Sequence, residues 1–435
     1  MNWKYANWIV GLIAAALPVQ AEMDRAVVAE SLTLEQAYDR VFATDQTIRI
    51  AYVEIQKANL LPLSALTRQA PRVLGNASYA KPEHEITSAS LLTTKRADLT
   101  IELPLIDFTV FPAWRAGKLS VQSARLAQRF VVRNVLFGVT AAYYDVLKQH
   151  RVVEVNRQTL ELARGQFELA QKRFNVGDVT KTDVLRARVT VERSQRTLTE
   201  AENVLRLAHS VLASILNLGT ECPVVLIDPP AYPVSVESLA ALQERAAAGR
   251  EDLRVARLAV ETAKAKRGEV IAQYGPRLVA QWSNVWLDPA TPSQPNNFWQ
   301  ATVAVQIPFF EGGQRELDLR RTGLERTQAD LNYENLTKSI AVDVKEVWLR
   351  AHSLEQTLQA LHAEVEAADE NYRSLENQYR AGTATSLDVL DALRDLSTAR
   401  TDLTVQTYGY QLALRDLERV TGVFQQPRVE KIKQP

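Results

Sequence analysis

The stretch FNVGDVTKTDVL at residues 174–185 recurs as YRAGTATSLDVL at residues 379–390, a shift of 205 positions. Matches at one nearly constant shift indicate an internal duplication. Prolines cluster between residues 223 and 233, which marks the junction of the two copies. Three further anchors keep the spacing: 71–74 with 276–279, 103–106 with 307–310, and Ala51 and Ala58 with Ala256 and Ala263.

Very long helices flank each glycine turn. No proline occurs from 113 to 174, so about 60 helical residues would extend ~90 Å. The stretch from 313 to 379 is similar, and apolar residues recur at three- and four-residue spacing with charged residues between them. A helix of this length buries its apolar stripe only against neighbours of equal length, which predicts coiled-coil packing. An earlier helix is predicted in each copy, at 33–66 and at 235–273.

Two segments alternate strictly between apolar and polar residues, as strands with one apolar face do. They are residues 98–105 and 299–309, and each is preceded by a less regular strand, 73–80 or 278–287. Each copy therefore contributes one hairpin.

The predicted organisation is a mainly α chain with a small β part. It consists of a signal peptide (1–21), a first repeat (22–222) with hairpin 72–107 and helix pair 113–218, a linker (223–234), a second repeat (235–422) with hairpin 277–310 and helix pair 313–422, and a C-terminal tail (423–435).

Composition excludes several classes of protein. Of the 435 residues, 51 are Lys or Arg and 51 are Asp or Glu, whereas a nucleic-acid binder normally carries a basic excess. The single cysteine, Cys222, rules out a disulfide scaffold. The five histidines show no metal-ligand spacing, so neither a metal site nor a cofactor is expected.

The N-terminus reads as an export signal. Lys4 precedes an apolar run from Trp8 to Leu17, and Val19-Gln20-Ala21 forms a small-residue cleavage site. The alternative is an uncleaved anchor helix, but the run is about half of a membrane span. No run of 18 consecutive apolar residues follows residue 22, so no membrane-spanning helix is predicted.

Four strands cannot close a membrane barrel, which needs at least about eight. Either the sheet is a small soluble one or several chains pool their strands. The strand length of roughly ten residues and the alternation suit a bilayer strand.

This order of elements resembles the outer-membrane efflux protein family, the TolC-like outer membrane factors. The resemblance rests on the two turn segments quoted above, on Ser31-Leu32-Thr33-Leu34-Glu35-Gln36-Ala37 at the first helix start, and on Pro308-Phe309-Phe310-Glu311-Gly312-Gly313 at a strand-to-helix junction. It covers essentially the whole mature chain.

The resemblance implies a homotrimer with a shared 12-stranded β-barrel in the outer membrane and an α-helical tunnel across the periplasm. The linker and the tail would form a belt around the tunnel. The implied partners are a periplasmic adaptor (membrane fusion protein), an inner-membrane transporter and outer-membrane lipid. The implied function is the passive exit duct of a tripartite efflux or type I secretion system.

The resemblance also assigns Asp388 and Asp391 to the constriction of the periplasmic entrance. Their three-residue spacing places both on one helix face, so a trimer would present six carboxylates whose mutual repulsion raises some pKa values. The alternative is a pair of solvated carboxylates at a helix N-terminus. Arg394, one turn onward, could neutralise part of the ring.

A latch that holds the entrance shut would involve Thr182, Asp183 and Tyr379. The alternative for Thr182 is a helix-start residue. Ala384 stands where some family members carry a basic residue, so the latch would be either weaker or rebuilt, with Lys181 or Arg186 as candidates. The turn glycines Gly177 and Gly382 would form the tip that docks the adaptor, and as C′ residues they reverse the chain.

Two other functions are alternatives to an exit duct. A periplasmic coiled-coil adaptor or scaffold would explain the helices but not two period-two hairpins. An exported enzyme would need a catalytic constellation, and no nucleophile elbow, phosphate-binding glycine loop or HExxH motif occurs.

Overall fold

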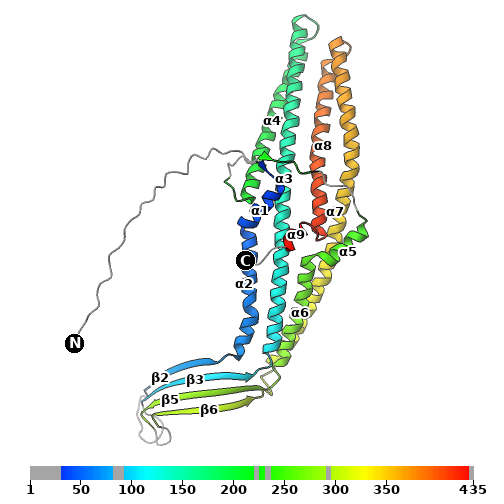
Figure 1. The fold of residues 1–435 in the computed structure, drawn as a ribbon. Coiled ribbons are helices and arrows are strands. Elements are labelled where there is room, and N and C mark those ends of the chain that lie inside the picture. Colours follow the sequence, from blue (N-terminus) through cyan, green and yellow to red (C-terminus); the bar gives the residue numbers. More distant parts are fainter. Residues whose placement is uncertain (1–30, 82–92, 220–224, 231–236, 291–294, 431–435) are drawn as a thin grey trace, which may run out of the picture.

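The structure is a computed structural model that describes residues 31–81, 93–219, 225–230, 237–290 and 295–430. The predicted signal peptide lies outside the described residues. The chain forms a long helical rod with a sheet at one end (Figure 1). Its main elements are α1 (Leu34–Thr44), α2 (Gln46–Leu66), β2 (Arg72–Ala80), β3 (Thr94–Ile106), α3 (Val110–Asn175), α4 (Lys181–Ile215), α5 (Leu239–Gly249), α6 (Glu251–Ala272), β5 (Arg277–Asp288), β6 (Asn297–Gln306), α7 (Gln314–Ala381), α8 (Ser386–Val420) and α9 (Gln426–Glu430).

The sheet is antiparallel, with the strand order β2–β3–β5–β6. Its register aligns the alternating positions of all four strands. Leu99, for example, pairs with Asn284, which pairs with Trp299, and directly paired residues share a face. One face therefore collects most of the apolar side chains, and the other collects polar ones. The apolar face includes Val73, Leu99, Ile101, Leu103, Trp282, Trp286, Trp299 and Val303, and the polar face includes Asn76, Asp98, Thr100, Glu102, Gln281, Ser283, Gln300 and Thr302.

Both outer edges of the sheet are unpaired in one chain. The edge strand β2 is exposed along its whole length, and β6 is exposed at most positions. Unpaired backbone groups on strands of 9 and 10 residues are a template for pairing with another chain. The second predicted strand of the second copy, 299–309, is displaced toward the N-terminus. The strand β6 begins at Asn297 and ends at Gln306, so Ile307–Phe309 lie beyond it.

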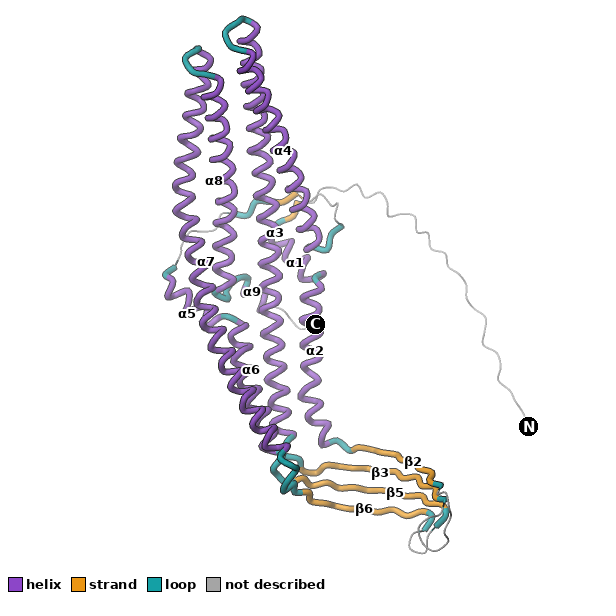
Figure 2. The backbone as a smooth tube through the Cα atoms, turned by 180° about the vertical axis from the view of Figure 1, so that it is seen from behind, coloured by secondary structure: helices purple, strands orange, loops and turns teal. Residues whose placement is uncertain are grey.

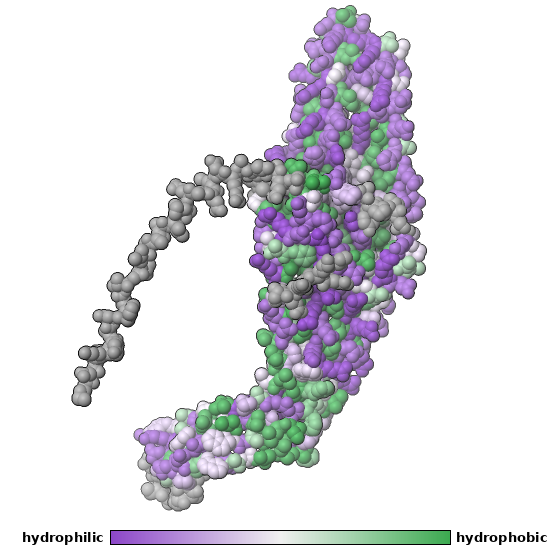
Figure 3. Space-filling view, viewed as in Figure 1, coloured by the Kyte–Doolittle hydropathy of each residue, from purple (hydrophilic) through white to green (hydrophobic). Residues whose placement is uncertain are grey.

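The helices continue the order of the strands. α2 packs on α3, α3 on α6, and α6 on α7, so four helices lie side by side above the four strands (Figures 1 and 2). Beyond the middle of the rod the chain continues as two helix pairs, α3/α4 and α7/α8, which both end far from the sheet. The helix α3 has 66 residues and is about 100 Å long. In the space-filling view the rod is mostly hydrophilic, while hydrophobic surface gathers on the sheet and at its junction with the helices (Figure 3).

The first predicted helix of each copy is wrong in one respect: each is broken in two. The chain leaves the helical conformation at Asp45 (φ −69°, ψ 128°) and at Arg250 (φ −68°, ψ 128°), again 205 positions apart. Asp45 then caps α2 by accepting a hydrogen bond of 2.9 Å from the backbone N–H of Ile48. The break lets α1 and α5 turn away from the line of α2 and α6.

A close approach of backbones fixes α2 against α3. A Cβ atom on Gly117 would lie 2.7 Å from the backbone nitrogen of Pro62 and 2.9 Å from the carbonyl carbon of Leu61. Only glycine fits this crossing. A Cβ atom on Gly138, in the same helix, would meet nothing within 4 Å.

A buried ion pair ties the middle of the rod together. Arg133 of α3 pairs with Glu251 at the start of α6 and donates a 3.0 Å hydrogen bond to the carbonyl of Phe424. The Arg133 side chain is 3% exposed and that of Glu251 is 9% exposed. The pair thus joins both copies and the C-terminal segment at one point.

Among the described residues one helix, α3, is long and apolar enough to cross a membrane by length and average hydropathy. It contains no run of 18 consecutive apolar residues. Half of its most apolar window is buried within the fold, as in the core helix of a bundle.

Candidate functional site at the tip

The two glycine turns lie at the end of the rod opposite the sheet (Figures 1 and 2). We call residues 174–185 and 379–390 the tip. Gly177 (φ +85°) and Gly382 (φ +83°) adopt the left-handed conformation, which favours glycine. Their N–H groups bond back to Phe174 and Tyr379, at 3.0 and 3.1 Å. Both glycines therefore close a helix, as predicted.

Identical capping boxes start the descending helices. Asp183 Oδ2 accepts from the Thr180 hydroxyl at 2.7 Å and from its N–H at 3.1 Å. Asp388 Oδ2 accepts from the Thr385 hydroxyl at 2.7 Å and from its N–H at 2.9 Å. Asp183 and Asp388 thus both bond their helix caps, a role that the site prediction did not give them.

This hydrogen bonding sets the charge of Asp388. The Thr385 hydroxyl, followed by the Thr385 N–H, lowers the pKa of Asp388 below its usual value. The direction in the single chain is opposite to the rise expected from repulsion within a ring. Asp388 is therefore a firmly ionised carboxylate at the tip.

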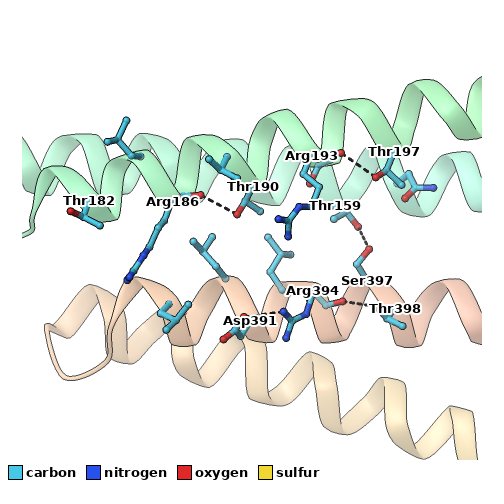
Figure 4. A pocket seen from close by; sticks show the side chains of 17 residues that line it. Thr159, Thr182, Arg186, Thr190, Arg193, Thr197, Asp391, Arg394, Ser397 and Thr398 are labelled. Atoms are coloured by element: carbon cyan, nitrogen blue, oxygen red, sulfur yellow. Dashed lines mark hydrogen bonds and ion pairs between the residues drawn. The ribbon is translucent and has the colours of Figure 1, made fainter.

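Asp391 is partly neutralised, as its neighbour suggested. Its carboxylate lies 3.3 Å from the guanidinium of Arg394. Both residues line a groove of about 480 Å³ between α4 and α8. Arg186 extends from α4 across this groove toward the start of α8 (Figure 4). The Asp391 carboxylate therefore shares this groove with the guanidinium groups of several arginines.

The three latch residues do not form one shared contact. Thr182 lines the groove between α4 and α8 (Figure 4), and its side chain makes no hydrogen bond to another described residue. It is not the helix-start residue either, because Thr180 caps α4. Tyr379 is 3% exposed and packs on the other side of the tip, against α3.

At the tip, Arg173 links the two helix pairs. From the last turn of α3 it donates a hydrogen bond to the Tyr379 carbonyl of α7, and its guanidinium lies 4.8 Å from the centre of the Tyr379 ring. A weaker ion pair, 3.9 Å long, joins it to Asp178. Sequence reasoning missed Arg173, and its only signal was a basic residue in a last helical turn.

Burial raises the pKa of Tyr379, which Arg173 opposes and Asp183 reinforces. Its hydroxyl is buried. The Ser386 side chain interacts with it and lowers the pKa, although no hydrogen bond of standard geometry forms to a described residue. The Asp183 charge therefore acts on Tyr379, whereas Thr182 lines a different surface.

Two more contacts join the pairs along the rod. Gln166 of α3 donates to the Tyr372 hydroxyl at 3.1 Å and to Glu376 at 3.3 Å. Thr159 donates to the hydroxyl of Ser397 at 3.0 Å. These contacts form a polar seam that ends at Arg173, and no sequence pattern indicated it.

A duplicated chain with an amphipathic sheet and a long helical rod defines a class of outer-membrane channel. The family profile described as "Outer membrane efflux protein" matches this chain twice, at 37–218 and at 242–423. The two matches are 205 residues apart, like the internal repeat. The chain therefore belongs to the outer membrane efflux protein family and is an outer-membrane channel that extends into the periplasm.

Individual relatives agree with this assignment. The outer membrane efflux protein BepC of Brucella suis is 24% identical over 94% of this chain and 90% of its own length. The alkaline protease secretion protein AprF of Pseudomonas aeruginosa is 23% identical over 77% of this chain and 71% of its own. The crystal structure of the outer membrane protein VceC of Vibrio cholerae superposes with a TM-score of 0.76 at 18% identity, covering 89% of this chain and 96% of that one.

Proposed function

We propose that three copies of this chain form the passive exit duct of a tripartite efflux or type I secretion system. The unpaired edges of the sheet support this proposal most strongly. Closing β6 of one copy on β2 of the next satisfies both edges and yields a barrel of 12 strands. The apolar sheet face then meets lipid and the polar face lines the lumen.

The helices close in the same way. In each copy α2 and α7 are the outer members of the four-helix layer, so α7 of one copy would pack on α2 of the next. Exposed leucines on α7 support this closure: Leu317, Leu324 and Leu331 recur every seven residues and are about 60% exposed. The linker 223–234 and the tail 423–435 would belong to the belt, and the repeats would span 22–222 and 235–422.

In this proposal the chain has no enzymatic role and draws its energy from an inner-membrane transporter. A periplasmic adaptor contacts the tip at Gly177 and Gly382. Asp388 and Asp391 of three copies constrict the entrance and favour cations. Arg173, Tyr379 and Asp183 hold the two helix pairs together. Thr182 contributes from α4, across the groove that separates α4 from α8 of the same copy. The tip opens when partner contact favours a state in which these links are broken.

Intermolecular cross-linking tests the assembly. In a background with Cys222→Ser, cysteine at Ala77 of β2 is combined with cysteine at position 299, 301 or 303 of β6. All of these positions lie on the apolar face. At least one pair is expected to give covalent trimers in detergent after oxidation. Monomers throughout, from a protein that conducts ions in a planar bilayer, would overturn the proposed closure, and a water-soluble monomer would favour a scaffold.

A further inference from the structure

A groove lined by arginines lies between α3 and α6, nearer to the sheet than the tip is. It has a volume of about 430 Å³. We call its main residues the arginine groove: Arg125, Arg129, Arg254, Arg257, Leu126 and Leu258. The two leucines give it an apolar floor between guanidinium groups.

The positive charge of the groove is not neutralised. Its one acidic lining residue, Glu261, already pairs with Lys264 at 2.7 Å. Arg254 donates to the carbonyl of Ala248 at 2.8 Å. Arg125, Arg129 and Arg257 make no side-chain hydrogen bond or ion pair to another residue in the described part of the chain.

The field of these groups is visible at Glu261. Its pKa is lowered first by the hydrogen bond from Lys264 and further by Arg115 and Arg257. The chain as a whole carries equal numbers of basic and acidic residues. A local excess of four arginines over one engaged carboxylate is therefore a feature of this groove and not of the overall composition.

The groove lies on the side of the helix layer that also carries the extra elements. Arg133, one turn beyond Arg129, bonds Phe424 just before α9, and Arg254 bonds the end of α5. Elements that thicken the layer on its inner side would block a tunnel, so this side faces outward if the proposed assembly holds. Because α3 and α6 are the two middle helices of the four-helix layer, a neighbouring copy at either edge would not cover the groove.

Membrane lipid is out of reach. Arg125 is 15 residues from the first residue of α3, a distance of about 22 Å along the helix. The headgroup layer on one side of a bilayer is only about 5–8 Å thick. A ligand of this groove must therefore come from the periplasm.

We propose that the arginine groove binds a periplasmic anion that carries at least two carboxylate or phosphate groups. Guanidinium groups bind both by paired hydrogen bonds, and the leucine floor accommodates the carbon skeleton between the charges. The outward orientation rests on the proposed trimer, whereas the binding itself does not.

Binding of labelled hexaglutamate to the purified full chain in detergent tests the site, at about 50 mM and about 300 mM salt. The variant is Arg125→Gln/Arg129→Gln. The matched control is Lys57→Gln/Lys266→Gln, which removes the same charge from a groove formed by α2, α3, α6 and α7. That groove uses residues 120, 123 and 124 of α3, which lie on a different face from 125 and 129.

The arginine variant is expected to weaken binding by about tenfold or more, while the control stays within about twofold. Binding should fall at the higher salt concentration. Competition by tripolyphosphate would extend the site to phosphate ligands, and lack of competition would restrict it to carboxylates. Absence of hexaglutamate binding at low salt, or equal weakening by both variants, would overturn the proposal. Trimer formation and conductance, measured on the same samples, separate this result from a failure of the proposed duct.

Discussion

Replacing Arg173 tests whether its contacts hold the two helix pairs of the tip together. The substitution Arg173→Met keeps most of the side-chain stem and removes the charge that binds the Tyr379 carbonyl and ring. A hydrogen bond from a charged donor contributes about 1.5–3 kcal/mol, and an exposed cation–π contact about 0.5–1 kcal/mol. Because the Arg173 side chain is 18% exposed, solvent screens part of this interaction energy. We therefore expect the substitution to remove about 2 kcal/mol of stabilisation per copy.

A loss of about 2 kcal/mol shifts an equilibrium by roughly 30-fold. We therefore expect the open fraction of single channels in a planar bilayer to rise by about that factor, or by more if the three copies open together. Arg164→Met is the matched control, because Arg164 bonds Gln195 within the same helix pair at 3.0 Å and does not reach α7. If the two variants, equally folded by circular dichroism, show the same open fraction, Arg173 is not a latch.

Three further predictions follow from packing and charge. Gly117→Ala should cost about 1–3 kcal/mol through overpacking and lower Tm, whereas Gly138→Ala should stabilise by up to about 1 kcal/mol; the reverse order in thermal melts would contradict the fold. Arg133→Met should cost about 3 kcal/mol in urea unfolding because it leaves Glu251 buried and unpaired, and the double variant Arg133→Met/Glu251→Met should recover most of this; an unrecovered double variant would refute the pairing. Asp388 has a lowered pKa, so its charge and its stabilising cap are present above the ordinary value and are lost only as pH falls through the folded value; block of the channel by multivalent cations should persist toward pH 4 and be weaker in Asp388→Asn, and a block that fades near pH 6 would argue against it.

The internal repeat predicted more of the fold than any single motif did. Turn glycines, helix pairs and hairpins recur at the predicted places because they depend on local periodicity. The break at Asp45 was missed because no proline or glycine lies beside it. The break at Arg250 was missed although Gly249, a possible stop signal, directly precedes it. The breaks are themselves repeated 205 positions apart, although Asp45 caps its helix with its side chain and Arg250 does not.

The candidate site was less predictable. Asp388 and Asp391 occupy one helix turn as expected, but a cap holds one and Arg394 pairs with the other. Thr182 and Tyr379 lie on different sides of the tip, because Thr182 lines the groove between α4 and α8 whereas Tyr379 contacts Arg173 of α3. Arg173 became visible only when α3 and α7 were placed side by side.

The sequence by itself determined the duplication, the helical and strand periods, the glycine turns and the export class, since each depends on residues close together along the chain. The tertiary structure decided the strand register, which gathers the apolar positions of four strands on one face and leaves two edges unpaired. It also decided that Arg173 meets Tyr379, that Arg133 meets Glu251 and Phe424, and that the arginines of α3 lie beside those of α6. These contacts join residues more than a hundred positions apart, and their geometry depends on how helices about 100 Å long are packed against one another.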